Sequence, residues 1–493
     1  QLSLARALSR RAAPRALGSF GALPRAESRR HISAAQQLMT DAFRRYGHLE
    51  ARIDPLGLAP AIDCVELKSA VARAVQEEGD AARSLEASLR RVYCSSMAVE
   101  MEHMDNVEER AWLAAELERH GGVPPASRAE LLNAHTLMTM AEEYELFMQR
   151  KFVSFKRYSG EGAESVLPGL HTMFHELARN GVTDVVLGMP HRGRLAMMLT
   201  LLDLPAHKLF TKVLGHSEFP EAWELVDDVS SHLFLSLDKS FAGAPPLHVS
   251  MLPNPSHLEA INPVAQGKTR CKRELGRNAV NVLLHGDAAF SGQGIVPETC
   301  ALAALPGFRT GGTLHIVTNN QVGFTATHAE GRSSRYATCT AKGIGAPVLH
   351  VNGEDAGAVI HACRLAASFQ QRFGKDVFVD VLCYRKHGHN EVDEPSFTQP
   401  HMYDLIRSRQ PYPERLRRQL IDRGWLTQDK TDALRTRLVK HLEEQLARAR
   451  DTPRGEHPIS AFTHAWEGMR LANPGEMEQS PDTGLPVEQL RAV

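Results

Sequence analysis

Between about residues 151 and 400, the sequence passes repeatedly from a short apolar run into a polar or glycine-containing end, with helical stretches in between. The runs read TDVVLGMP, VNVLLHGD, TLHIVTNN, PVLHVNG and DVFVDVLCYR. Continuous apolar strands that alternate with helices are typical of a parallel sheet with both faces buried. The sequence therefore predicts an α/β domain over residues 151–400, with a mostly parallel sheet covered by helices.

The segments on both sides of this domain have a helical pattern. Over residues 33–150, a capping box at Ser127 and Glu130 opens the helical run SRAELLNAHTLMTMAEEYELFMQRKF. We therefore expect an all-helical N-terminal domain. Residues 401–451 return to charged amphipathic helix, and residues 452–493 are rich in Pro, Gly and polar side chains, as in a linker.

Length, charge and cysteine content exclude several classes of protein. The 493 residues, 43% of them apolar, are enough for several domains. A net charge of -1 gives no long-range attraction for nucleic acid or an anionic membrane, so we expect neither as a partner. No apolar stretch is long enough to predict a membrane-spanning helix. The seven cysteines include no C-x-x-C pair, which argues against disulfides or structural zinc and favours a reducing compartment.

The first thirty residues differ in composition from the rest of the chain. QLSLARALSRRAAPRALGSFGALPRAESRR holds seven arginines and a single acidic residue, Glu27. Abundant arginine, serine and alanine with few acids is typical of a mitochondrial transit peptide. We therefore expect residues 1–32 to direct the protein to the mitochondrial matrix, with a disordered basic tail as the alternative.

Polar side chains follow two neighbouring apolar runs of the α/β domain. Asp287 comes directly after VNVLLHG, and Asn319 and Asn320 end TLHIVTNN. Asp287 and Asn320 are 33 residues apart, the length of one strand-helix-strand unit, so a right-handed crossover brings both strand ends to one edge of the sheet. Carboxylate and amide oxygens suit Mg²⁺, and Gly292 and Gly294 let backbone N–H groups approach an anion. The stretch predicts a magnesium-diphosphate site, with an ordinary turn and cap as the alternative.

A Gly-Asp pair followed 33 residues later by Asn-Asn resembles the thiamine diphosphate motif. Five stretches occur in the order GMPHRGRL, NPSHLEAINPV, HGDAAFSGQGIVPET, NNQVGFT and YRKHGHNEVDEP. In that order they resemble the first, decarboxylating component of the 2-oxoglutarate dehydrogenase family, from roughly residue 40 to the end. A nucleotide-binding dehydrogenase is disfavoured, because no G-x-G-x-x-G opens a helix after the first strand.

This resemblance implies the thiamine diphosphate-binding fold, with thiamine diphosphate and Mg²⁺ as cofactors. It implies oxidative decarboxylation of a 2-oxodicarboxylic acid, transfer of the acyl group to the lipoyl arm of a partner acyltransferase, and a homodimer. Asp287 and Asn320 are then side-chain ligands of the magnesium ion, and Val322 offers its backbone carbonyl. The other implied contacts of thiamine diphosphate are Arg192, Ala288 and His389.

His191 and His257, in PHRGR and NPSHLE, resemble active-site histidines that face the oxoacid. Groups that titrate near neutrality and donate hydrogen bonds suit the proton transfers that follow decarboxylation. Arg192, next to His191, carries a permanently charged fork that can bind phosphate oxygens in pairs. These residues therefore join the expected site.

The stretch YRKHGHNEVDEP admits two interpretations. Cys383, His387, His389 and Glu391 could form a zinc cluster, but their spacing does not match a common structural zinc pattern. We prefer a loop that closes over the cofactor diphosphate, with His389 as its contact. The cysteines take no catalytic role, because thiamine itself supplies the nucleophile.

Three positions favour the 2-oxoadipate branch of the family. KRYSGEG places Tyr158 where the 2-oxoglutarate enzymes typically have phenylalanine, and Gly160 where they have a larger apolar residue. Asn262, in HLEAINP, also resembles the 2-oxoadipate branch. The tyrosine hydroxyl and the asparagine amide can donate hydrogen bonds to the far carboxylate of a substrate one methylene longer. Phe324 in NNQVGFT instead resembles the 2-oxoglutarate pattern, so 2-oxoglutarate is the alternative substrate.

The resemblance leads beyond the last residues, TGLPVEQLRAV, into a second α/β domain that holds the pyrimidine ring and the activating glutamate. We expect the chain as given to be a C-terminally truncated form without decarboxylase activity, because half of the cofactor cleft is absent. Whether it is a fragment or a short isoform stays open. A non-catalytic binding form is the alternative function.

Overall fold

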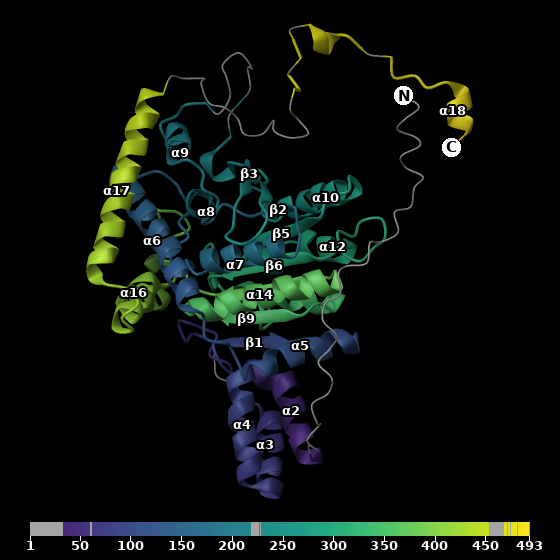
Figure 1. Cartoon of the computed structure of the whole chain (residues 1–493), viewed down its shortest axis with the longest axis vertical. Helices are drawn as coiled ribbons and strands as arrows, with labels where there is room; N and C mark the ends of the chain where they lie inside the picture. The colour runs from purple at the N-terminus through teal and green to yellow at the C-terminus, as the bar shows by residue number, and fades with distance from the viewer. Residues whose placement is uncertain are drawn as a thin grey trace.

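The computed structural model of the chain describes residues 33–59, 62–217, 226, 228–452, 468–470, 472–473, 475–480 and 482–492. The predicted transit peptide over residues 1–32 lies outside these ranges, and so does much of the predicted linker. Within the described ranges, Figure 1 shows a central sheet with helices on both faces and a group of helices that projects from one end.

An eight-stranded sheet forms the centre of the fold, with the strand order β1-β9-β10-β6-β5-β2-β4-β3. The inner strands are parallel, whereas β1 and β3 lie antiparallel at the two edges. The five apolar runs form β2, β5, β6, β9 and β10, so the predicted parallel sheet is confirmed. The strands are β1 (Met97–Glu100), β2 (Asp184–Gly188), β3 (Leu235–Lys239), β4 (Leu247–Met251), β5 (Ala279–Gly286), β6 (Thr313–Asn319), β9 (Val348–Asn352) and β10 (Val377–Leu382), and a separate hairpin joins β7 (Val322–Gly323) to β8 (Ala326–Thr327).

Helices cover both faces of the sheet. On one face, α7 (Val166–Arg179) and α14 (Ala356–Phe373) pack against each other and lie in front of the strands in Figure 1. The other face is covered by α10 (Ile261–Glu274), α11 (Asp287–Gly292), α12 (Ile295–Leu302) and the 3-10 helix η4 (Ala337–Ile344). The predicted α/β architecture is therefore confirmed.

The two faces differ in chemistry because successive side chains of a strand point to opposite sides. Towards α7 and α14, the strands present buried Val, Leu and Ile side chains of the main hydrophobic core, such as Val185, Leu187, Val282, Ile316, Val351 and Val379. Towards the opposite face, the same strands present the buried polar side chains His285, His315, Asn319, His350 and Asp380. That second face is stable only if each of these groups finds a hydrogen-bond partner.

The N-terminal segment is helical, as predicted, with one correction. α2 (Ala34–Tyr46), α3 (Val65–Glu78) and α4 (Asp80–Tyr93) form a bundle that projects beyond the sheet in Figure 1. The segment is not all-helical, because Met97–Glu100 forms β1 and pairs with β9. A strand of four residues is too short to display a period in the sequence. Two further helices complete the segment, α5 (Val107–Arg119) and α6 (Arg128–Lys151), and the predicted capping box of α6 is present.

Helices also follow the α/β domain, as predicted for residues 401–451. α17 runs along one side of the molecule in Figure 1 and packs against α6 and α9. In the described part of the chain, no helix combines the length and the apolar character needed to cross a membrane. The helices not yet given are α8 (Arg194–Thr200), α9 (Ala206–Val213), α13 (His328–Gly331), α15 (Pro400–Ser408), α16 (Tyr412–Asp422), α17 (Gln428–Asp451) and α18 (Val487–Arg491).

A buried ion cluster ties β1 to the sheet. His350 of β9 lies between two carboxylates, with its Nδ1 2.9 Å from Asp380 Oδ2 and its Nε2 3.0 Å from Glu100 Oε1. Burial alone would lower the pKa of His350, but the hydrogen bonds to Asp380 and Glu100 outweigh burial and raise the pKa to about 9. Glu100 also pairs with Lys342, and His48 Nε2 lies 3.8 Å from its carboxylate. The imidazolium therefore gives both buried carboxylates a cationic partner.

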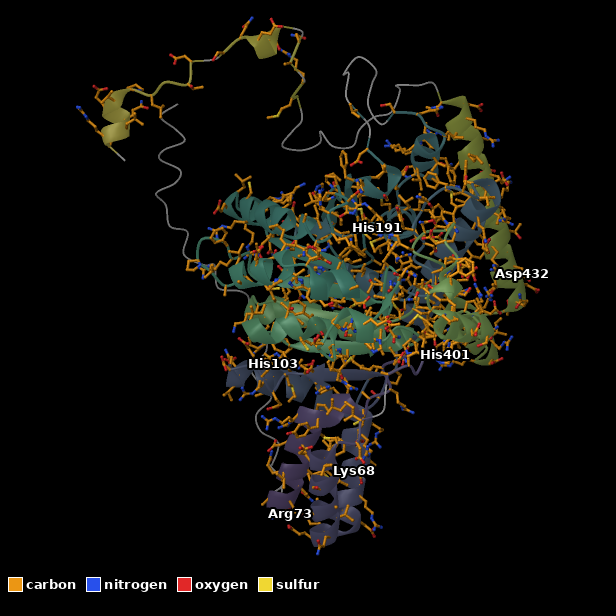
Figure 2. All side chains as sticks on the ribbon, turned by 180° about the vertical axis from the view of Figure 1, so that it is seen from behind. Lys68, Arg73, His103, His191, His401 and Asp432 are labelled. Atoms are coloured by element: carbon orange, nitrogen blue, oxygen red, sulfur yellow. The ribbon has the colours of Figure 1, made fainter. Side chains whose placement is uncertain are left out.

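The stability of the chain should depend on the charge of His350. Because its folded-state pKa of about 9 lies above the ordinary 6.5, this contribution is complete below pH 6.5 and is lost as the pH rises through 9. We expect His350→Gln to destabilise the fold at pH 6.5 by about 2 to 4 kcal/mol, and to remove the fall in thermal unfolding midpoint between pH 6.5 and 9. His401→Gln, at an exposed position labelled in Figure 2, is the control. A variant that keeps the wild-type pH profile would contradict this account.

Candidate active site

The predicted metal ligands lie at the carboxyl ends of β5 and β6. Asp287 is the first residue of α11 and follows β5 directly, while Asn320 follows β6. The parallel register places Gly286 opposite Thr318, so Asp287 and Asn319 are level on adjacent strands. The two strand ends therefore meet at one edge of the sheet, as the sequence spacing predicted.

A short turn after β6 brings the chain back towards α11. Gln321 at its centre has a φ of 64°, and the Val322 N–H donates to Asn320 Oδ1 at 3.4 Å. The next residue, Gly323, lies so close to α11 that a Cβ on it would be 2.4 Å from the Cβ of Ala288. Only glycine fits at this contact, which holds the turn beside the start of α11.

Two side chains anchor this turn to the rest of the domain. Gln321 Nε2 donates to Asp54 Oδ1 at 2.8 Å and to the carbonyl of Cys383 at 3.2 Å. Asn319 Nδ2 donates to Asp380 Oδ1 at 3.1 Å. The turn is thus fixed from the N-terminal segment and from β10, and Asp380 connects it to the buried ion cluster of His350.

Asp287 is a buried carboxylate with a cationic neighbour, since Arg332 Nη1 lies 3.1 Å from its Oδ2. Burial raises the pKa of Asp287 to about 6, although Arg332 opposes the rise. A buried carboxylate favours a nearby cation, and Asn320 Oδ1 and the carbonyl of Val322 add the oxygen donors that Mg²⁺ prefers. The residues therefore fit the magnesium ion of a thiamine diphosphate site. We call Asp287, Asn320 and Val322 the metal corner.

Rings from four segments of the chain form an aromatic cluster next to the metal corner. The ring centroids of Tyr158 and His191 are 4.4 Å apart. The ring of His389 lies 5.7 Å from that of Tyr158 and 5.6 Å from that of His191. Phe324, whose ring is 5.1 Å from His389, comes just after Val322, so the cluster adjoins the metal corner.

Arg192 connects the loops of this cluster through their backbone. Its Nη1 donates to the carbonyl of Ser159 at 3.1 Å, and its Nη2 donates to the carbonyl of His389 at 2.6 Å. Burial lowers the pKa of Arg192 to about 10, so the guanidinium stays charged at pH 7. The remaining N–H donors of the guanidinium are suited to an anionic ligand.

His191 lies within the body of the α/β domain, as Figure 2 shows, far from the projecting helices that carry Lys68 and Arg73. Burial, together with Arg192 and His389, lowers the pKa of His191 to about 3. The pKa of His191 therefore lies below the neutral range expected for it, because partial burial disfavours the imidazolium and a cation lies beside it. At pH 7 its imidazole is neutral, with one nitrogen as donor and the other as acceptor.

His257 and Asn262 are placed differently from the aromatic cluster. His257 is exposed in the loop before α10. Asn262 is buried, and its Nδ2 donates to Glu259 Oε2 at 2.8 Å while its Oδ1 has no partner. One of the two N–H donors of the amide that was expected to reach the substrate is thus bound to Glu259. Among the described residues, no hydrogen bond or ring contact joins Asn262 to Tyr158.

Glu259 begins a chain of buried polar groups that the sequence analysis missed. Its Oε2 accepts from His285 Nδ1 at 2.6 Å, His285 Nε2 is 3.0 Å from His315 Nδ1, and His315 Nε2 is 3.3 Å from Asp376 Oδ2. These three hydrogen bonds need three protons on four ring nitrogens. The chain satisfies the histidines on the polar face of the sheet.

The residues of the alternative zinc cluster have other partners. His387 Nε2 lies 2.7 Å from Glu161 Oε2, and Glu391 accepts backbone N–H groups of residues 157–159. Burial raises the pKa of Cys383 well above its usual value. Within the described ranges, no group of three or more His, Cys, Asp or Glu side chains could hold a metal ion. Glu161 and Glu391 had no sequence signal beyond their place in KRYSGEG and YRKHGHNEVDEP.

Comparison with known proteins places the chain in one family. Residues 137–457 match the family model described as "Dehydrogenase E1 component". The chain is 42% identical over 437 residues to the 2-oxoadipate dehydrogenase complex component E1 of Danio rerio, which covers 83% of this chain and 47% of that protein. It is 37% identical over 512 residues to the protein of the same name from Homo sapiens, covering 97% of this chain and 55% of that protein.

A 2-oxoglutarate dehydrogenase E1 component, from Brucella ovis, is also similar, with 36% identity over 490 residues that cover 92% of this chain and 48% of that protein. The chain spans about half the length of the curated relatives it matches. The family match includes the metal corner and the aromatic cluster. The resemblance inferred from the sequence motifs is confirmed, and the chain belongs to the dehydrogenase E1 component family, whose members depend on thiamine diphosphate.

Proposed function

We propose that the complete protein catalyses the oxidative decarboxylation of a 2-oxodicarboxylic acid, with 2-oxoadipate favoured, and passes the acyl group to the lipoyl arm of a partner acyltransferase. The observation that carries this proposal is the metal corner, where the buried Asp287 meets the turn of Asn320 and Val322 at the ends of two parallel strands. Relatives named as 2-oxoadipate and 2-oxoglutarate E1 components match most of the chain and support it.

In this proposal, the metal corner holds the magnesium ion that binds the diphosphate, and Ala288 lines the same edge. Thiamine diphosphate, when bound, supplies the nucleophile. Arg192 and His389 would contact the cofactor from their adjacent loops. His191, neutral at pH 7, donates a hydrogen bond that orients a substrate oxygen, and His257 contacts the oxoacid from its exposed loop.

Tyr158 is the residue that we assign to the far carboxylate of the substrate. Its ring lies against His191 and His389, and among the described residues its hydroxyl takes part in no hydrogen bond. Asn262 then influences the bound substrate indirectly, because its amide binds Glu259. Phe324 in NNQVGFT, which resembles the 2-oxoglutarate pattern, makes 2-oxoglutarate the second candidate substrate. We also propose a homodimer and a location in the mitochondrial matrix.

Asp287→Asn should weaken Mg²⁺-dependent binding of thiamine diphosphate by at least about tenfold, or roughly 1.4 kcal/mol. The reason is that a neutral amide of the same size replaces the hard anionic ligand. Titration calorimetry on the complete protein, with and without Mg²⁺, measures the effect. Asp432→Asn, at an exposed position on α17 labelled in Figure 2, is the matched control. Equal affinities in a folded variant would rule out the metal corner.

Arg332→Gln should have the opposite effect on the metal. Because the guanidinium competes with a cation for Asp287, its removal should raise the affinity for Mn²⁺ alone by about threefold or more. The same variant should unfold at a lower temperature without metal, since Asp287 then lacks its partner. Electron paramagnetic resonance of free Mn²⁺ gives the affinity, and Arg335→Gln in the same segment is the control. An unchanged or weaker affinity for Mn²⁺ would contradict competition at Asp287.

Tyr158→Phe should reduce the preference for the longer substrate. We expect the kcat/KM ratio of 2-oxoadipate over 2-oxoglutarate in the complete enzyme to fall by about five- to tenfold, because one hydrogen bond to the far carboxylate is lost. Asn262→Ser should change the ratio less, and Tyr46→Phe on the projecting bundle should not change it. A wild-type enzyme that favours 2-oxoglutarate would overturn the assignment of the substrate.

A further inference from the structure

Tyr158 has a backbone conformation that tyrosine rarely adopts. Its φ of 51° lies in the left-handed region, where the Cβ of an ordinary residue is crowded. Residues persist in this region only where their surroundings fix them, and such residues are frequent at ligand sites. The groups that fix Tyr158 come from other segments of the chain.

One carboxylate binds three successive N–H groups around Tyr158. Glu391 Oε2 accepts from the N–H of Arg157 at 2.9 Å and from that of Tyr158 at 3.3 Å. Glu391 Oε1 accepts from the N–H of Ser159 at 2.8 Å. Successive N–H groups that converge next to a residue with positive φ form a concave site for an anion. Here the anion is a side chain of the same protein, and the bonds are strengthened by its charge.

The carbonyls of the same loop are bound from another side. The Gly193 N–H donates to the carbonyl of Tyr158 at 2.8 Å, and Arg192 Nη1 donates to the carbonyl of Ser159 at 3.1 Å. With its N–H and its carbonyl both bound, the backbone of Tyr158 has a single orientation. From this backbone its ring lies in the aromatic cluster, against His191 and His389.

The loop that carries Glu391 is held by a reciprocal contact. Glu161, shortly after Tyr158, accepts from His387 Nε2 at 2.7 Å and pairs with Lys386. The Lys386 N–H also donates to the carbonyl of Glu161 at 3.2 Å. Glu391 thus binds the loop of Tyr158, and Glu161 of that loop binds the loop of Glu391. These two contacts hold Glu391 in a fixed position.

We propose that Glu391 is a positioning residue that holds the ring of Tyr158 at the substrate pocket, and that it thereby sets the selectivity between 2-oxodicarboxylic acids of different length. The selectivity rests on the proposed function, whereas the clamp on residues 157–159 rests on geometry alone. Glu391 touches neither substrate nor cofactor in this role, since it acts through Tyr158.

Glu391→Gln tests the proposal, because it keeps the size of the side chain while it replaces one acceptor by an amide that faces N–H donors. The matched control is Glu394→Gln, an exposed residue of the same loop that binds Ser396 and Arg407 instead. In the chain as given, hydrogen exchange of the amides of residues 157–159 should accelerate about tenfold or more in Glu391→Gln and stay unchanged in the control. In the complete enzyme, the kcat/KM ratio for the six-carbon over the five-carbon acid should fall by about fivefold or more.

The two measurements separate the parts of the inference. Unchanged exchange in Glu391→Gln would overturn the clamp, whatever the substrate. Faster exchange with an unaltered kcat/KM ratio, in an enzyme that discriminates between the two acids, would overturn the role in selectivity. If the wild-type enzyme uses neither acid, the proposed function fails, and the exchange alone decides whether Glu391 holds Tyr158. A loss of stability would lower kcat for both acids equally, and therefore cannot imitate a change in their ratio.

Discussion

A parallel sheet that is buried on both faces needs hydrogen-bond partners for the polar side chains that it places inside, and this need governs the architecture of the described part of the chain. One face avoids the cost of burying polar groups, because it presents Val, Leu and Ile side chains to α7 and α14. The other face carries buried polar side chains, and its buried histidines are paired with carboxylates. His350 bridges Asp380 and Glu100, while His285 and His315 lie between Glu259 and Asp376. Partnered charges of this kind add little net stability, but removal of one partner is costly.

The polar face also explains how the candidate site is held in place. Asp380, which binds His350, binds Asn319 as well and so orients the strand end that leads to the metal corner. Glu259, which receives His285, fixes the loop that contains His257. The candidate site residues therefore lie at the ends of a hydrogen-bonded network, which suits the proposed binding of a cation and a substrate. A substitution that changes one of these buried charges would therefore alter the site, although the substituted residue contacts no ligand.

The sequence was sufficient for the sheet and for the position of the metal corner, because both follow from local patterns. Apolar runs with polar ends predicted β2, β5, β6, β9 and β10, and the spacing of Asp287 and Asn320 predicted their convergence. It was not sufficient for β1, whose pairing with β9 depends on a distant partner. Nor could it show that Asn262 binds Glu259, or that Glu391 binds residues 157–159, since these contacts join segments through the tertiary fold. The low pKa of His191 is likewise a product of burial, which no motif encodes.

The edge strand β1 has a consequence for how the chain reaches its final structure. Glu100 and His350 are 250 positions apart, so during synthesis the N-terminal helices leave the ribosome long before their partner strand exists. Until β9 has been made, β1 exposes an unpaired edge, and Glu100 has no imidazolium. Closure of such a long loop is slow compared with the formation of helices. The projecting bundle can therefore form as a local unit, whereas its attachment to the sheet has to wait until β9 has been made.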